Sequence, residues 1–267
     1  MSALAARVAA VIPCKDEADR IAATVRAVAA LPQVGRVVVV DDGSRDETAP
    51  VAEAAGAVVV RHPRNRGKAA ALESGVRRVR ELEDAAAAAA SAAAGGGAAA
   101  DAAADPAAAW PAAAWPAALL FVDGDLAETA ANLGVLTTPV LEGAADMTIA
   151  TLPAQITAGG GRGLVVGLSR RGIEHLTGFR PVQPLSGMRC VSPAAFTAAT
   201  PLARGWGVET ALTVDVLRAG LTVLEVPCEL QHRVSGSDWR GQVHRGAQYR
   251  DVWLALVKRG WRPWHRG

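Results

Sequence analysis

The sequence predicts an α/β fold in which a mostly parallel, mixed sheet is flanked by helices. Two observations lead to this prediction. Short apolar runs rich in β-branched residues alternate with stretches of helical periodicity between residues 8 and 122, which is the order typical of doubly wound sheets. Each run also ends in a polar loop, and such sheets bind ligands at the carboxyl ends of their strands. We therefore expect these loops to share one edge of the sheet.

The elements of the first half are expected in strict alternation. The strands are predicted at 8–12, 36–40, 57–61 and 118–122, and the helices at 17–31, 44–56 and 67–84. The second helix has its own start signal, because Ser44 is followed three residues later by Glu47, which is the spacing of a capping box.

Low-complexity sequence separates the third helix from the fourth strand. Residues 84–118 are rich in alanine and are interrupted by glycine and proline, so we expect a partly helical or disordered insertion there. Beyond it, strands are predicted at 146–151, 186–192 and 221–228, and helices at 164–177, 208–220 and 241–258. The expected organisation is one domain over 1–239 and a basic, tryptophan-containing helix and tail over 240–267.

Net charge and cysteine spacing indicate which partners and which cellular compartment to expect. The net charge of +2 implies no strongly charged partner, so no nucleic-acid binding is expected. Cys14, Cys190 and Cys228 are widely spaced, which argues against a disulfide framework or a zinc site and fits a reducing cytosol. The sequence predicts neither a signal peptide nor a transmembrane helix. We therefore expect a cytoplasmic protein.

Two carboxylates end the fourth predicted strand. Asp123 and Asp125 follow the apolar run 119–122, with Gly124 between them. Residues i and i+2 of an extended segment point the same way, so both side chains can approach one object. Mg²⁺ takes carboxylate oxygens and is often shared with substrate phosphates. The alternative is an Asp-Gly turn in which Asp125 caps the next helix; the position at the ligand edge favours the metal.

Acidic residues also follow the first two strands. Asp41 and Asp42 end the second one, where a carboxylate could accept hydrogen bonds from a base or a ribose, or could order the turn together with Ser44. After the first strand, Asp16 is expected to cap the next helix and Glu17 to contact a ligand.

A glycine and a lysine stand at the start of the third predicted helix. Backbone N–H groups at Gly67 and the ammonium group of Lys68 would form an anion site there. The segment is not a P-loop, because His62 and Ala69 replace the glycine and the hydroxyl residue of that motif. No G-x-G-x-x-G pattern follows the first strand, which argues against a nicotinamide or flavin dinucleotide.

Four of these motifs occur together, in order, at strand exits: "VIPCKDEADRI", "VVVVDDGSRDET", "NRGKAAAL" and "LLFVDGDL". In this combination the chain resembles a family 2-type glycosyltransferase of the GT-A fold, over 7–83 and 118 to about 235. The resemblance implies a UDP- or GDP-linked sugar donor and a divalent metal, Mg²⁺ or Mn²⁺. It implies donor contacts at the following residues: Pro13, Glu17, Asp42, Gly67, Lys68, Asp123 and Gly124. It also implies that Asp123 and Asp125 bind the metal and that Asp125 is catalytic.

The second half is similar to the bacterial glucosyl-3-phosphoglycerate synthases, a subgroup of that family. The similar segments are "AGGGRG", "QPLSGMRCVS", "GWGVETALTVDVLRAGL" and "LQHR". They imply acceptor or sugar contacts at the following residues: Gly161, Arg162, Leu185, Ser186, Gly187 and Trp206. They further imply catalytic roles for Glu209 and Arg162 and a third metal ligand, His232. The structural alternatives are a first-turn helix acid for Glu209 and a surface histidine for His232.

Two departures from the subgroup concern the acceptor. Gly163 stands where a small hydroxyl residue would help to hold an acceptor phosphate, and Val234 follows the "HR" pair. We therefore expect a transferase that acts on a small anionic acceptor of phosphoglycerate-like chemistry, and a homodimer is left open.

Three alternative functions stay open. A polyprenyl-phosphate glycosyltransferase at the inner face of the membrane would use the tail, which mixes Trp253, Trp261 and Trp264 with basic residues, an interfacial signature; a helix packed on its own domain is the structural alternative. A nucleotidyltransferase would normally carry glycines after the first strand, and "PCKDEADR" lacks them. A non-catalytic nucleotide-sugar binder would not need both acids of the D-x-D pair.

Overall fold

The computed structural model describes residues 7–93, 116–152, 162–230 and 239–262. Its strands are β1 (Val8–Cys14), β2 (Val34–Asp41), β3 (Val58–Arg61), β4 (Ala118–Phe121), β5 (Met147–Thr151), β6 (Arg189–Val191) and β7 (Val223–Pro227). Its α-helices are α1 (Ile21–Ala29), α2 (Thr48–Ala54), α3 (Lys68–Ala93), α4 (Gly134–Leu141), α5 (Arg162–Thr177), α6 (Pro193–Ala199), α7 (Val208–Arg218) and α8 (Trp239–Lys258). Two 3-10 helices, η1 (Ala127–Leu133) and η2 (Gly205–Gly207), complete the elements.

The strands form one seven-stranded sheet in the order β3-β2-β1-β4-β6-β5-β7. Strands β3, β2, β1 and β4 run parallel to one another, whereas β6 pairs antiparallel with both β4 and β5. The predicted mixed, mostly parallel sheet is therefore confirmed. Because β6 runs against its neighbours, the loop that precedes β6 lies at the same edge as the loops that follow β1, β2 and β4.

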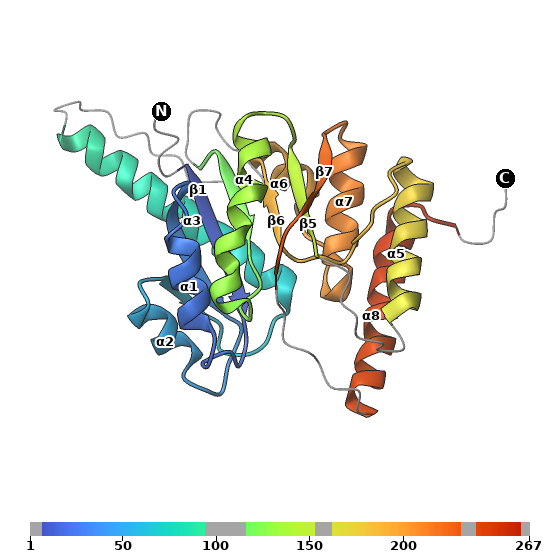
Figure 1. Cartoon of the computed structure of the whole chain (residues 1–267), viewed down its shortest axis with the longest axis horizontal. Coiled ribbons are helices and arrows are strands. Elements are labelled where there is room, and N and C mark those ends of the chain that lie inside the picture. Colours follow the sequence, from blue (N-terminus) through green and yellow to red (C-terminus); the bar gives the residue numbers. More distant parts are fainter. Residues whose placement is uncertain (1–6, 94–115, 153–161, 231–238, 263–267) are drawn as a thin grey trace.

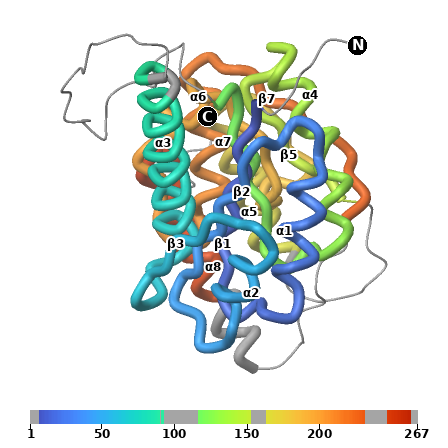
Figure 2. The backbone as a smooth tube through the Cα atoms, turned by 90° about the vertical axis from the view of Figure 1, so that its left-hand side faces the viewer, coloured from blue at the N-terminus to red at the C-terminus, as the bar shows by residue number. Residues whose placement is uncertain are grey.

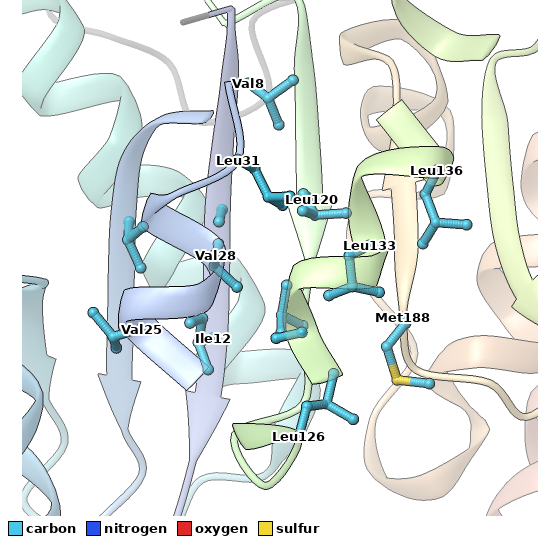
Figure 3. Close-up of a cluster of buried hydrophobic side chains, with 14 of the residues drawn as sticks. Val8, Ile12, Val25, Val28, Leu31, Leu120, Leu126, Leu133, Leu136 and Met188 are labelled. Atoms are coloured by element: carbon cyan, nitrogen blue, oxygen red, sulfur yellow. The ribbon is translucent and has the colours of Figure 1, made fainter. Parts of the chain in front are cut away.

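Both faces of the sheet are covered, which explains why its central strands are apolar along their whole length. In β1, Ala10 and Ile12 pack into a core shared with α1, η1 and α4, and Ala9 and Val11 pack into a second core shared with α3, α6 and α7. Figure 2 shows α3 and α1 on opposite sides of β1 and β2. Figure 3 shows the first of these cores, in which Val25 and Val28 of α1 meet β1.

A third, smaller core joins α5, α7 and α8. It contains Val165 and Leu168 of α5, Val214 of α7, and Val252 and Leu256 of α8. Figure 1 shows α5 and α8 side by side beyond α7. The apolar face of the C-terminal helix therefore packs on the rest of the protein. Within the described ranges, no helix is long and apolar enough to span a lipid bilayer.

Several predicted boundaries were wrong for identifiable reasons. Helix α2 starts at Thr48, and no side chain caps it; the hydroxyl of Ser44 instead accepts a hydrogen bond from the backbone N–H of Asp16, at 2.9 Å, so the capping box does not form. Helix α3 continues through the start of the alanine-rich segment to Ala93, since alanine is the best helix former.

Two helical regions between strands were not predicted. Helix α6 has a clear start signal, because Ser192 accepts a hydrogen bond from the N–H of Ala195 and Pro193 occupies the first turn. The η1–α4 region begins with no side-chain cap and contains Pro139 within α4. Neither feature is a helix-start signal, so the local sequence there gives little indication of a helix.

Candidate active site

The strand registers bring the polar loops to one edge of the sheet. Cys14 at the end of β1 pairs with Asp41 at the end of β2, and Asp41 also pairs with Arg61 at the end of β3. On the other side of β1, Val11 pairs with Phe121, which ends β4 two residues before Asp123. The loops after these four strands are therefore neighbours, as the sequence predicted.

The loop after β1 is hydrogen-bonded to the loop after β2. The N–H of Asp16 donates to Ser44 Oγ at 2.9 Å, and the N–H of Arg45 donates to Asp16 Oδ1 at 2.7 Å. The N–H of Glu17 donates to Thr48 Oγ1 at 2.8 Å. Asp16 adopts a positive φ of 56°, which makes the chain turn here, and α1 begins only at Ile21. The prediction that Asp16 caps this helix was therefore wrong.

Asp42 is buried and hydrogen-bonded within the protein. Its Oδ1 accepts from the N–H of Arg66 at 2.8 Å and lies 2.7 Å from Nδ1 of His62. Its Oδ2 accepts from the N–H of Gly67 at 2.7 Å. The other ring nitrogen of His62 lies 3.0 Å from Ser74 Oγ in α3. Asp42 thus organises the loop that leads into α3.

Asp41 points to a different environment. Its Oδ1 accepts from the N–H of Ser44 at 2.8 Å, and the residue lines a pocket of about 810 Å³ that Asp42 does not line. The pocket residues are Lys15, Asp41, Gly43, Ser44, Arg45, Asp46, Arg61, His62, Pro63, Arg64 and Asn65. The sequence analysis predicted a donor contact at Asp42, whereas the acid that lines this pocket is its neighbour Asp41. Successive side chains at a strand end point in opposite directions, so the sequence alone could not decide between them.

Gly43 makes this pocket possible. Its φ is +75°, and an added Cβ would lie 2.6 Å from the carbonyl carbon of Arg64. The loop after β2 therefore packs backbone to backbone against the loop after β3, which only glycine allows.

Lys68 is the centre of a second polar cluster at the same edge. Its Nζ lies 2.7 Å from Asp123 Oδ1 and 3.0 Å from Glu209 Oε1. Burial alone would lower the pKa of Lys68, but the carboxylates of Asp123 and Glu209 outweigh it and raise that pKa above its ordinary value. The lysine therefore carries a positive charge at neutral pH and joins the loop after β4 to the start of α7.

Two glycines pack closely around this cluster. A Cβ at Gly187 would lie 2.3 Å from Lys68 Nζ and 2.7 Å from Asp123 Oδ1. A Cβ at Gly124 would lie 2.9 Å from the Cβ of Cys14. Gly187 thus lets the loop before β6 touch the ion pair, and Gly124 lets the loop after β4 lie against β1.

The turn between Asp123 and Asp125 is fixed by α1. Thr24 donates its hydroxyl proton to the carbonyl of Gly124 at 2.9 Å and accepts from the N–H of Ala127 at 2.9 Å. Arg20 Nη1 donates to the carbonyl of Asp125 at 3.3 Å. The N-cap position of η1 is Leu126, whose side chain makes no capping hydrogen bond.

The chemistry of this edge fits a divalent cation. Asp123 already holds the ammonium cation of Lys68, and Asp125 supplies a second carboxylate two residues later. Within the described ranges, no group of three His, Cys, Asp or Glu side chains gathers as a metal site, and His232 lies outside those ranges. Two carboxylates suit a metal that also binds substrate phosphates.

The remaining predicted site residues differ in whether the structure describes them and in how far they are buried. Gly161 lies outside the described residues, and Arg162 is described only as the first backbone position of α5. Ser186 is buried, Leu185 packs on the core of α5, α7 and α8, and Trp206 is 41% exposed. Of the predicted site residues, the following four lie in contact with one another: Lys68, Asp123, Gly187 and Glu209.

Comparisons with known proteins agree with this architecture. Residues 9–81 match the family described as glycosyl transferase family 2. No curated protein sequence matches the chain. Glucosyl-3-phosphoglycerate synthase from Mycobacterium tuberculosis, in complex with phosphoglyceric acid, is 25% identical with a TM-score of 0.67, and the match covers 95% of this chain and 80% of that one.

Two further crystal structures of the Mycobacterium tuberculosis synthase give similar matches. The complex with Mn²⁺, uridine diphosphate and phosphoglyceric acid is 25% identical, with a TM-score of 0.67 and coverage of 95% and 78%. The complex with Mn²⁺, uridine-diphosphate-glucose and phosphoglyceric acid is 25% identical, with a TM-score of 0.67 and coverage of 95% and 79%. These findings confirm the GT-A fold and the resemblance that the sequence predicted.

Proposed function

We propose that this chain is a glycosyltransferase of the family 2 type, which moves a sugar from a UDP- or GDP-linked donor to a small anionic acceptor with the help of a divalent metal. The observation that carries the proposal is the cluster of Lys68, Asp123 and Glu209 beside a polar pocket at the carboxyl edge of the sheet. Asn65 lines the pocket and Lys68 starts the helix that follows, so one donor molecule would reach from the pocket to the cluster.

The pocket is suited to the nucleoside end of the donor. Its volume of about 810 Å³ lies in the range of small-molecule sites. Asp41 would accept hydrogen bonds from the base or the ribose. Lys15, Arg45 and Arg64 also line the pocket and would favour an anionic ligand. Among the two acids of the "DD" pair, we therefore assign the nucleoside contact to Asp41 and a supporting role to Asp42.

The diphosphate would lie at the D-x-D turn. Asp123 and Asp125, with His232, would hold Mg²⁺ or Mn²⁺, which supplies Lewis-acid stabilisation of the leaving diphosphate when bound. Lys68 would add a fixed positive charge and keep Asp123 and Glu209 in place. Glu209 would either orient a sugar hydroxyl or accept the proton of the attacking acceptor hydroxyl.

The acceptor assignment is supported by the similar enzymes and by one arginine. The matched synthase was crystallised with phosphoglyceric acid, and Arg162 of this chain would meet a phosphate or carboxylate group, which guanidinium recognises well. Gly163 and Val234 depart from the expected pattern, so a related small phosphorylated acid is the substrate class that we propose.

A lipid-linked acceptor is the second candidate, and one observation favours it. Tyr249, Trp253 and Leu254 of α8 are 43%, 36% and 40% exposed, although the opposite face of this helix is buried in the core with α5 and α7. Large exposed aromatic residues beside basic ones are typical of helices that lie at a membrane surface.

A donor screen would test the proposal. Release of nucleoside diphosphate is measured for a panel of UDP- and GDP-sugars, with 3-phosphoglycerate and with a short polyprenyl phosphate as acceptors, in the presence and absence of EDTA. We expect turnover that needs the metal and the small acid, and turnover about 1,000-fold lower in the variant Asp123→Asn. Turnover with polyprenyl phosphate alone, together with flotation on anionic liposomes, would favour the second candidate. Metal-independent turnover would contradict the assigned role of the D-x-D pair.

A further inference from the structure

Arg189 is a buried cation at the start of β6. Only 1% of the residue is exposed, and it pairs with Phe121 at the end of β4 and with Ile149 of β5. Among the described residues, none of the ion pairs includes it. Burying a guanidinium without a direct carboxylate partner is costly, and an apolar side chain of similar volume would often be at least as stable. The burial of Arg189 therefore needs another explanation.

The guanidinium fixes the loop that precedes β6. Its Nε donates to the carbonyl of Ser186 at 2.9 Å, and its Nη2 donates to the carbonyl of Pro184 at 3.0 Å. The next residue of this loop, Gly187, is the one that lies against Lys68 and Asp123. The hydroxyl of Ser186 is itself buried and has no hydrogen-bond partner within the described part of the chain. Arg189 thus holds the loop at the point where it reaches the ion pair.

The same guanidinium also reaches the other side of the cluster. Its Nη1 donates to Thr213 Oγ1 at 2.8 Å, and this hydroxyl donates to the carbonyl of Glu209 at 2.9 Å. Glu209 is the residue whose carboxylate lies 3.0 Å from Lys68 Nζ. One side chain therefore connects, through three hydrogen bonds, both segments that flank Lys68.

Burial lowers the pKa of Arg189 to about 10, against the opposing effect of the carboxylates of Glu209, Glu225 and Asp123. The guanidinium consequently stays charged at neutral pH and contributes positive potential behind the acids of the cluster. A neutral side chain at this position would remove both the hydrogen bonds and this charge.

We propose that Arg189 is a positioning residue of the transferase site, which sets Gly187 and Glu209 at their distances from Lys68 and Asp123 without touching substrate. The expected effect of Arg189 on turnover rests on the proposed function. Its expected effect on the loop before β6 rests on the geometry alone. The sugar end of the donor is where the effect should appear, because the pocket assigned to the nucleoside is lined only by residues between 15 and 65.

The test compares Arg189→Met, Arg189→Lys and a matched control, Arg170→Met. Arg170 donates to two carbonyls of the same loop, those of Pro181 and Val182, at 2.8 and 2.6 Å, but it does not hold the part next to Gly187. We expect Arg189→Met to lower kcat by about 100-fold, since a displacement of about 1 Å in a site costs that much. We expect the lysine to restore part of kcat. Binding of the nucleoside diphosphate, measured by calorimetry, should stay within about twofold, and kcat of Arg170→Met within about threefold.

Equal losses of kcat in Arg189→Met and Arg170→Met would overturn the proposal, because loop stability alone would then explain them. So would an unchanged kcat in Arg189→Met. If that variant does not fold, Thr213→Val removes only the link to Glu209, and we expect about tenfold lower kcat with an unchanged thermal transition; a wild-type kcat would count against Arg189.

Hydrogen exchange separates this proposal from the proposed function. In Arg189→Met, but not in Arg170→Met, the amides of 185–188 and 209–213 should exchange faster by about tenfold or more. If the wild type turns over no nucleotide sugar, the proposed function fails, yet this exchange pattern would still support the positioning role. Unchanged exchange in Arg189→Met would overturn it.

Discussion

Two pairs of acids leave strands on either side of β1, and they are used in opposite ways. Asp41 ends β2 and Asp42 follows it, and Asp123 and Asp125 follow β4. The first pair accepts hydrogen bonds from backbone N–H groups of nearby loops. In the second pair, Asp123 faces the ammonium group of Lys68. The first pair therefore orders the backbone of its loops, whereas Asp123 of the second pair is held by a charged side chain.

Because of this difference, we expect one pair of acids to contribute mainly to stability and the other mainly to activity. A carboxylate that satisfies buried N–H groups is needed whether or not a ligand is present, because buried donors left without acceptors are costly. A carboxylate paired with a partly exposed lysine can exchange its partner for a metal ion at smaller cost. Substitutions in the two pairs should consequently separate into two classes.

The largest effect is expected from Asp123→Asn. Loss of one metal ligand should lower kcat by about 1,000-fold, because the Lewis-acid contribution is worth several kcal/mol. The transition temperature should shift by only a few degrees, since Lys68 and Asp123 are each about a quarter exposed at the side chain. Mn²⁺ binding in the presence of uridine diphosphate, followed by electron paramagnetic resonance, should weaken in parallel. Unaltered Mn²⁺ affinity would remove Asp123 from the predicted metal ligands.

Gly187→Ala should give the next largest effect on activity. The new Cβ would overlap Lys68 Nζ and the carboxylate of Asp123, so the pair must move and kcat should fall by about 100-fold. Gly167→Ala in α5 is the control, because a Cβ there meets nothing within 4 Å and alanine favours helix. Similar kinetics for both variants would show that the close approach of Gly187 has no role in turnover.

Asp42→Ala should act mainly on stability. It would leave the N–H of Arg66 and Nδ1 of His62 without their acceptor. The N–H of Gly67 would keep only Asn65 Oδ1. We expect a loss of about 3 kcal/mol in the free energy of unfolding. Urea denaturation checks this, with the exposed Asp19→Ala as the control, for which we expect less than about 0.5 kcal/mol. A loss as small as the control's would mean that Asp42 does not support the loop.

Thr24→Val should have a smaller effect on stability. Valine has nearly the shape of threonine but cannot bond to Gly124 and Ala127, so we expect a loss of about 1–2 kcal/mol in the free energy of unfolding. The turn between Asp123 and Asp125 would also loosen, and the KM for the donor should rise. A variant with wild-type KM would show that the turn keeps its conformation without α1.

The smallest effect concerns the three cysteines, which should not react with a thiol reagent in the native protein. Burial, followed by the charges of Asp41, Glu17, Asp46 and Asp42, raises the pKa of Cys14; burial raises those of Cys190 and, to about 11, Cys228. A raised pKa leaves little thiolate at pH 8. A thiol reagent should therefore label these cysteines only in urea, and rapid labelling of the native protein would contradict their burial.

Much of the fold was predictable because its first half consists of local signals. The β-branched run of β2 and the helical periodicity of α1 are readable without tertiary information, and four strand exits implied a shared edge. The pairing of Lys68 with Asp123 at that edge lies between elements far apart in the sequence, and no local pattern predicted it.

The errors arose where tertiary contacts replaced local ones. Ser44 bonds to the neighbouring loop instead of its own helix, and Asp16 bonds to Arg45 instead of capping α1. Asp41 and Asp42 are adjacent acids whose roles depend on which side of the strand end each one faces. Arg189 looks like an ordinary basic residue in the sequence, because its acceptors are two carbonyls, one hydroxyl and the sulfur of Met147, none of which a motif can indicate.

The reversed direction of β6 has a consequence for how this enzyme could be re-engineered. The loop that precedes β6 leads into a strand, whereas the loops after β1, β2 and β4 lead towards helices. Its sequence therefore does not have to supply helix-capping residues. Residues 180–188 could therefore be exchanged with the corresponding stretch of another transferase, with Arg170 at one end and Arg189 at the other as fixed attachment points. Because both arginines bond to backbone carbonyls, these attachment points would persist whatever side chains the exchanged stretch carries, provided that Gly187 is kept.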